Sequence, residues 1–209
     1  MAPNAAVPGS VRPGGRTARV REAVLQAAGD LLAEHGFAAL DLAEVATRAQ
    51  VGKTTVYRRW RTPAGLVTEL LGDMAETSLP HADTGSLRGD LVANARLVAR
   101  TLTDGRQGPL FKALLAAGIC DPETTAALHH FYDVRLTEWE PCITAAIGRG
   151  EISPETDARA VLSAVSAPLY YRFLASGDPI DDAVAVTAAE AAVTAARAGL
   201  FSRVAGPMR

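Results

Sequence analysis

Apolar residues recur at intervals of three and four along most of the chain, which is the spacing of an amphipathic helix. The first such run predicts a helix over residues 17–35, with apolar positions at Val20, Val24, Leu25, Ala28, Leu31 and Leu32. Gly36 follows and favours the left-handed conformation that ends many helices. Strict alternation of apolar and polar residues is scarce, so the pattern predicts an all-α protein of about nine helices.

The same spacing predicts further helices between the turn signals. Two short ones fall within residues 41–60, and the others span 62–78, 86–103, 109–118, 122–148, 154–176 and 181–201. Pro141 and Pro168 lie inside two of these segments; Pro141 is expected to kink or split its helix, and Pro168 to bend its own. No run of about 18 apolar residues occurs, so we expect no membrane span.

Residues 41–60 predict two short helices joined by a tight turn. Asp41 is placed to cap the first helix, and Glu44, three residues later, completes a capping box. The turn is formed by residues 50–52, and Val51 is expected to point inward and hold the corner.

The second helix of this pair has a buried side and a cationic side. Val56 and Trp60 are four residues apart and form the buried side. The polar positions are Lys53, Thr54, Thr55, Tyr57, Arg58 and Arg59, with Arg61 just beyond. Two helices at this spacing, the second polar and cationic, predict a helix-turn-helix whose second helix enters a DNA major groove.

Charge is divided unevenly along the chain. Residues 1–62 hold nine Lys and Arg against five Asp and Glu, whereas residues 63–209 hold twelve against eighteen. A basic N-terminal unit on an acidic body suits a polyanionic partner that is touched at one end only. The charge pattern therefore agrees with DNA as the partner.

The stretch VGKTTVYRRW, at residues 51–60, resembles the helix-turn-helix of the TetR family of bacterial transcriptional regulators. The resemblance extends over residues 18–66 and includes the pair Thr55 and Tyr57 and the aromatic Trp60. It implies a dimeric, all-helical repressor whose C-terminal domain binds a small molecule and thereby shifts the DNA-reading helices out of register. We accordingly expect a disordered tail over 1–16, a DNA-binding domain over 17–62, and a ligand-binding and dimerisation domain over 63–209.

The chain departs from that family's usual pattern at three positions. Gln50 stands where the family usually has glycine, and a positive φ there costs about 1 kcal/mol. Gly52 replaces the usual serine cap, and Pro63 replaces a lysine that meets DNA phosphate. The backbone amides at the start of that next helix can still bind a phosphate, and the arginines just before it supply charge.

Position in the motif assigns a role to each polar residue. The resemblance makes Thr55 and Tyr57 phosphate contacts through their hydroxyls. Lys53 and Thr54 are best placed to meet base edges, because a lysine can bond guanine O6 or N7 and a threonine offers a methyl to thymine. Arg58 is expected to contact a base or a phosphate. Arg59 and Arg61 are expected to contact phosphate.

A ligand pocket is expected among the middle helices, as the family implies and as helical bundles commonly allow. The candidate lining residues are Met74, Phe111, Leu114, His129, Tyr132, Trp139 and Tyr170. The polar groups that would select a ligand are His129, Arg96 and Arg100. Ordinary core packing is the alternative for each of them. Few charges cluster here, so we expect an apolar or aromatic ligand of modest size, with no cofactor and no metal.

The last two predicted helices are apolar over a wide arc. Burial inside one chain explains this, and so does a two-fold interface in which both helices pair with their copies. Because helix-turn-helix proteins commonly bind paired half-sites, we favour a homodimer through these two helices on a near-palindromic operator. Four arginines make the distal part of the tail cationic, and they either reach DNA or are simply solvated: Arg12, Arg16, Arg19 and Arg21.

Two other function classes compete with a DNA-binding regulator in the cytoplasm. Gly52-Lys53-Thr54 matches the end of a nucleotide-binding loop, but that motif needs a glycine where Thr47 stands and a preceding strand. We therefore expect no enzyme of this kind. A helical small-molecule-binding or scaffolding protein without sequence-specific DNA binding is the second alternative, and it leaves the basic cluster unexplained.

Overall fold

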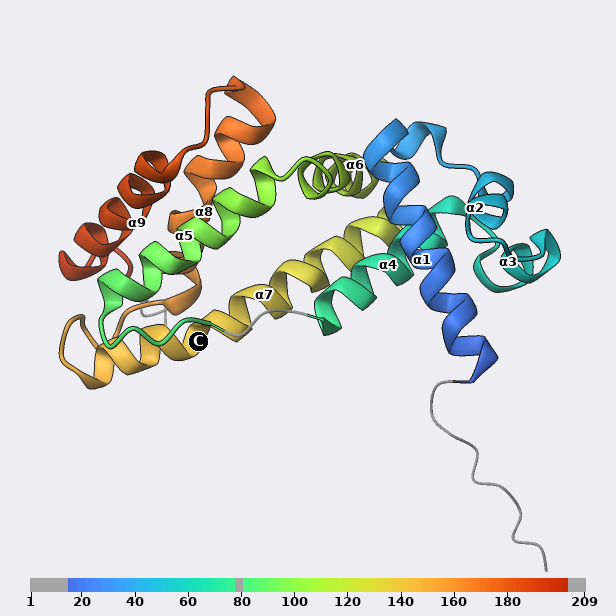
Figure 1. Ribbon diagram of the computed structural model, residues 1–209. Coiled ribbons are helices and arrows are strands. Elements are labelled where there is room, and N and C mark those ends of the chain that lie inside the picture. The colour runs from blue at the N-terminus through green and yellow to red at the C-terminus, as the bar shows by residue number, and fades with distance from the viewer. Residues whose placement is uncertain (1–14, 78–80, 203–209) are drawn as a thin grey trace, which may run out of the picture.

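The computed structural model describes residues 15–77 and 81–202, and within these residues the chain is all-helical (Figure 1). The helices are α1 (Arg16–His35), α2 (Leu42–Arg48), α3 (Lys53–Trp60), α4 (Pro63–Glu76), α5 (Leu87–Thr103), α6 (Gln107–Cys120), α7 (Pro122–Gly148), α8 (Ala158–Tyr171) and α9 (Asp182–Arg197). A 3-10 turn, η1 (Phe37–Ala39), follows α1, and a π-helical turn, η2 (Arg172–Ser176), follows α8. The predicted fold class is confirmed.

Most helices begin where a side chain accepts a hydrogen bond from the first turn. These caps are Asp41, Thr62, Ser86, Asp121, Asp157 and Asp181. Such caps satisfy backbone N–H groups that have no partner inside the helix. They explain why α8 begins at Ala158, later than predicted: Asp157 is its cap, and Thr156 is held in an isolated bridge to Ser202.

Neither internal proline splits its helix, and the bend expected at each stays a prediction. Helix α7 continues through Pro141 to Gly148, and α8 continues past Pro168 before it widens into η2. Both proline rings are exposed, so water can satisfy the carbonyl four residues earlier. The last helix ends at Arg197, before the predicted limit, because Gly199 has a φ of 75°. The predicted tail, apart from Gly15 and Arg16, lies outside the described residues, as does the predicted end of α4.

The buried side chains form two hydrophobic clusters. The first joins α1, α2, α3 and α4 to α6 and the first half of α7. The second joins α5, α8 and α9 to the second half of α7, and Phe173 of η2 packs against both. Figure 1 shows α2 and α3 at one end of the molecule and α8 and α9 at the other, with α4, α6 and α7 between them. The predicted helix-turn-helix unit therefore shares its core with the helices that follow it.

None of the helices in the described part of the chain is both long enough and apolar enough to cross a membrane.

Two helical glycines differ in the space around them, and this difference predicts opposite effects on stability. A Cβ at Gly108 of α6 would lie 2.5 Å from the carbonyl oxygen of Leu102, whereas a Cβ at Gly72 of α4 would have no neighbour within 4 Å. We expect Gly108→Ala to lower the free energy of unfolding by about 1–3 kcal/mol, because backbone must shift. Gly72→Ala should raise it by about 0.5–1 kcal/mol, because alanine favours the helix.

Urea unfolding followed by circular dichroism measures both changes. Equal effects of the two substitutions would contradict the close approach of α6 to the end of α5.

Candidate nucleic-acid interface

Helix α2 is short and is fixed at its start by Asp41. The carboxylate accepts hydrogen bonds from the backbone N–H groups of Ala43 and Glu44, at 2.6 and 3.1 Å. Among the hydrogen bonds of the described residues, no reciprocal bond from the Glu44 side chain occurs, so only the Asp41 half of the predicted capping box forms. Leu42, Val45 and Ala46 are buried.

The turn between α2 and α3 has the strained residue that the sequence predicted. Gln50 has a φ of 55°, in the left-handed region that favours glycine. Its N–H donates to the carbonyl of Thr47 at 3.2 Å, and the N–H of Val51 donates to Ala46 at 2.9 Å. Val51 is half-buried and packs against the first hydrophobic cluster. Gly52 then begins α3 with extended dihedral angles and without a side-chain cap, as predicted.

Helix α3 separates its apolar and polar residues as its spacing predicted. Val56 and Trp60 are 0% and 4% exposed, so Trp60 belongs to the core. The exposed side carries Lys53, Thr54, Tyr57, Arg58 and Arg59, with Thr55 half-buried and Arg61 exposed beyond the helix. The structure thus brings together all seven residues predicted to contact DNA, and their individual roles remain predictions.

The junction between α3 and α4 contains a second strained residue that the sequence did not indicate. Arg61 has a φ of 52°, and its N–H donates to the carbonyl of Tyr57 at 3.2 Å. Thr62 then caps α4 by accepting from the N–H of Gly65 at 3.0 Å. A Cβ at Gly65 would lie 2.9 Å from the carbonyl oxygen of Trp60, so this glycine allows the two helices to meet closely.

A carboxylate from α4 binds the end of α3, and sequence reasoning missed it. Glu69 accepts a hydrogen bond from Trp60 Nε1 at 2.6 Å and forms an ion pair with Arg59, whose Nη2 lies 2.8 Å from Oε1. Arg21 of α1 binds the same carboxylate at 2.5 Å. Burial disfavours the charged form of Glu69, but the hydrogen bonds from Arg59, Arg21 and Trp60 outweigh it and hold its pKa below the ordinary value.

The remaining cations of the motif differ in their partners. Arg48 of α2 pairs with Glu34 of α1 at 2.6 Å. Within the described ranges, Lys53, Arg58 and Arg61 form no ion pair, so their charge is available to an external anion. Their open positions support the predicted contact of this face with phosphate.

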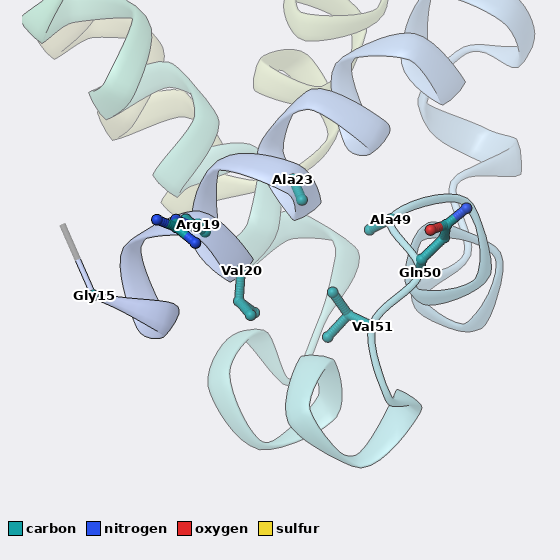
Figure 2. Close-up of a pocket in the computed structure, with 7 residues that line it drawn as sticks. All are labelled: Gly15, Arg19, Val20, Ala23, Ala49, Gln50 and Val51. Atoms are coloured by element: carbon teal, nitrogen blue, oxygen red, sulfur yellow. The ribbon is translucent and has the colours of Figure 1, made fainter.

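A shallow groove separates the first turns of α1 from the turn before α3. Figure 2 shows Val20 and Val51 on its two sides, with Arg19 near the start of α1 and Gln50 on the turn. A second groove continues along α3; its lining includes Thr17, Arg21, Gly52, Thr55, Arg58 and Arg59. The cationic face of α3 is therefore bordered by the N-terminal part of α1.

Six of the predicted pocket residues lie in or against the hydrophobic clusters. Phe111, Leu114 and Trp139 are buried; Met74, Tyr132 and Tyr170 are half-buried. The hydroxyl groups of Tyr132 and Tyr170 are hydrogen-bonded at 2.9 Å, which joins α7 to α8, and burial raises the pKa of both.

Phe131 and Phe173, which the sequence analysis did not select, belong to the same aromatic region. Phe131 packs against Tyr132 with 5.3 Å between ring centroids, and Phe173 lies under the ammonium group of Lys112. The spacing of apolar residues in the sequence does not distinguish an aromatic residue that lines a pocket from one that packs in the core.

Two predicted pocket residues have exposed side chains, and one of them, Arg100, lines a groove along α5 together with Arg96. His129 is exposed because Leu128 and Phe131 take the inward positions of that helical turn. Arg100 is exposed because Ala99 and Leu102 face the second cluster.

Arg96, the third polar candidate, is also exposed. Its guanidinium pairs with Asp182 of α9 at 2.6 Å. None of the three polar candidates faces the interior.

Comparison with known proteins covers both halves of the chain. A family model described as "Bacterial regulatory proteins, tetR family" matches residues 24–70, and one described as "Tetracyclin repressor-like, C-terminal domain" matches residues 81–192. The HTH-type transcriptional regulator YdeS of Bacillus subtilis, itself described as uncharacterized, is 33% identical over 77% of this chain and 81% of its own length.

Two further proteins are similar over most of their length. The DNA-binding transcriptional repressor TetR of Mycobacteroides abscessus is 32% identical over 77% of this chain and 85% of that protein. The crystal structure of the TetR family transcription regulator SCO0332 superposes with a TM-score of 0.66 and 28% identity, covering 84% of this chain and 97% of that one. The similarity therefore includes the region of α2 and α3 and the helices that follow.

The left-handed conformation of Gln50 predicts how the turn responds to substitution. Gln50→Val should lower the free energy of unfolding by about 1 kcal/mol, because a β-branched residue is disfavoured at positive φ. Gln50→Gly should not lower it, because glycine adopts this conformation without steric cost. Urea unfolding of the three proteins measures the difference. The exposed Gln50 side chain contributes little packing, so equal stabilities would show that the turn is not left-handed.

Proposed function

The chain belongs to the TetR family of bacterial transcriptional regulators, and from this membership we propose that it represses transcription as a homodimer on a near-palindromic operator. A small-molecule ligand would release it from the DNA. The observation that carries the proposal is the exposed cationic face of α3, presented beside a left-handed turn at one end of the molecule (Figure 1). Since the proposed partner is DNA, the cytoplasm is the proposed location.

The first turn of α3 is proposed to read bases. Lys53 and Thr54 are both exposed and lie at the N-terminal end of the helix, which is the end that contacts base edges in helix-turn-helix proteins. Thr55 and Tyr57 would bind phosphate through their hydroxyls, and Arg58 a base or a phosphate. These contacts would fix the helix in the groove and make binding depend on salt.

Phosphate contacts by the arginines near the end of α3 are also proposed. Arg61 is exposed beyond the helix, and Arg59 is exposed but paired with Glu69 in the free protein. A phosphate near Arg59 would therefore share that guanidinium with the carboxylate, since a guanidinium has five N–H donors.

The dimer interface is proposed to lie on α8 and α9. Tyr171 and Leu174, at the end of α8 and in η2, are 65% and 53% exposed, which is unusual for large apolar side chains. On α9, small residues such as Ala191 are exposed on the side away from the core. Pairing these surfaces about a two-fold axis would place two copies of α3 on one duplex.

A ligand is proposed to bind near the aromatic residues that join α4, α6, α7 and α8. The six buried or half-buried candidates are Met74, Phe111, Leu114, Tyr132, Trp139 and Tyr170. Their apolar character favours an apolar or aromatic ligand of modest size. Arg135 of α7 donates to the carbonyl of Met74 in α4 at 2.8 Å, so a change on α7 would reach the helix that follows α3.

Selection of bound sites from random duplex DNA tests the function directly. We expect the wild-type protein to enrich a near-palindromic sequence. Lys53→Ala should weaken its binding by about 1–3 kcal/mol and relax preference at one base position in each half-site. Lys112→Ala on α6 removes the same charge far from α3 and should change neither affinity nor preference. If no sequence is enriched, or if the two variants behave alike, the assignment of α3 is wrong.

The oligomeric state tests the proposed interface. Replacing both Tyr171 and Leu174 with Glu should convert a dimer into a folded monomer, because two charges would be buried at the two-fold axis. Ile119→Glu changes an apolar residue of α6 that is 86% exposed and should leave the dimer intact. Size-exclusion chromatography with light scattering at micromolar concentration measures both. A monomeric wild-type protein would contradict the proposal.

A further inference from the structure

Glu69 lies where three helices of the DNA-binding end meet. It belongs to α4, and its side chain is 24% exposed, so its carboxylate is partly withdrawn from water. All the side chains that bind it come from other helices: Arg21 from α1, and Arg59 and Trp60 from α3. A single carboxylate on α4 is thus the shared acceptor of side chains from α1 and α3.

The bonds from α3 define the orientation of that helix. Arg59 and Trp60 are consecutive residues of its last turn, and their shortest bonds go to different oxygens: Arg59 Nη2 lies 2.8 Å from Oε1, and Trp60 Nε1 lies 2.6 Å from Oε2. Arg59 Nε also donates to Oε2, at 3.5 Å. The guanidinium of Arg59 also lies 5.1 Å from the centroid of the Trp60 ring. Two directional bonds to two oxygens restrict both the rotation of α3 about its axis and its tilt against α4.

Arg21 completes the arrangement from the other side. Its Nε donates to Glu69 Oε1 and its Nη1 to Asp73 Oδ1, both at 2.5 Å. Glu69 and Asp73 are four residues apart, so they lie on one face of α4 and hold α1 against it. Hydrogen bonds from Arg59 and Arg21 lower the pKa of Glu69 and so favour the ionised carboxylate, whose two oxygens can both accept from α3.

The other connections between α3 and α4 leave the orientation of α3 less defined. The chain passes from one helix to the other through Arg61, which has a left-handed φ of 52°. The buried face of α3 consists of Val56 and Trp60, which make apolar contacts with the core. Hydrophobic packing of this kind has no preferred direction. Directional polar bonds are therefore what would hold the exposed residues of α3 in one register.

We propose that Glu69 is the positioning residue that sets the orientation of the DNA-reading helix α3 on α4. The proposal rests on the proposed DNA-binding function of α3 and adds to it a residue that contacts no base. The hydrogen bonds of Glu69 would couple α4 to the recognition helix. A shift of α4 would displace Glu69, and its bonds would then displace Arg59 and Trp60.

The sign of the effect on binding separates positioning from simple electrostatics. An acidic side chain close to DNA repels phosphate, so removal of its charge alone should strengthen binding to every duplex. Loss of a positioning residue should instead weaken binding to the operator while leaving non-specific binding unchanged or stronger. The ratio of specific to non-specific affinity therefore distinguishes the two roles.

The test compares Glu69→Gln with Glu22→Gln in the full-length dimer. Glu22 is exposed on α1, next to Arg21. Its replacement makes the same change of charge without removing a hydrogen bond to Arg59 or Trp60. Fluorescence anisotropy with the selected operator and with a scrambled duplex measures both affinities. We expect Glu69→Gln to lower the specificity ratio about tenfold, the effect of losing one charge-assisted hydrogen bond, whereas Glu22→Gln leaves the ratio unchanged.

Failure of this inference can be told apart from failure of the proposed function. A wild-type protein that does not prefer any duplex would overturn the function itself. A wild-type preference that Glu69→Gln retains would overturn only the role of Glu69.

If Glu69→Gln does not fold, the NMR signal of the Trp60 indole N–H provides a second test, in the wild-type protein and in Glu69→Asp. The indole N–H of Trp60, assigned by loss of its NMR signal in Trp60→Phe, should exchange slowly with water and shift downfield because it donates to a carboxylate. Glu69→Asp should shift that signal, since the shorter side chain cannot keep the same bond. Rapid exchange in the wild-type protein, or an unchanged signal in Glu69→Asp, would contradict the proposal.

Discussion

The packing of α4 into one hydrophobic cluster is the constraint on which the rest of the structure depends. Leu66, Val67, Leu70 and Leu71 are buried there, between the helices of the DNA-binding end and those that follow. Because the cluster includes residues of α1, α3, α6 and α7, the DNA-binding end has no separate core that would let it move freely. Any change in the position of α4 must repack both sides, which makes this helix the natural connection between ligand and DNA.

The polar contacts of α4 agree with its role as the connection between the ligand-binding helices and α3. At its C-terminal end the Met74 carbonyl accepts from Arg135 of α7, and near its middle Glu69 binds the end of α3. The apolar contacts supply most of the stability, whereas these directional bonds determine how α4 is placed against its neighbours. A ligand that alters α7 would therefore act on α3 through a helix held by both kinds of contact.

Local features were predictable from sequence because they depend on few residues. The cap by Asp41, the left-handed Gln50 and the burial of Trp60 follow from turn chemistry and from a spacing of four. The contacts of Glu69 and the left-handed conformation of Arg61 were missed, because both depend on how α3 meets α4. Most residues of the candidate DNA-binding face could thus be predicted, but not the contacts with α4 that hold this face in place. The exposure of His129 could not be predicted, because helical periodicity alone does not say which face of a helix has a neighbour.

Two copies of this chain are proposed to place α3 in two major grooves of one duplex. Hydroxyl-radical footprinting of the selected operator measures this most directly. We expect two protected stretches on one face of the DNA, separated by one helical turn of ~10 base pairs. A single protected stretch, or uniform protection along the duplex, would contradict it.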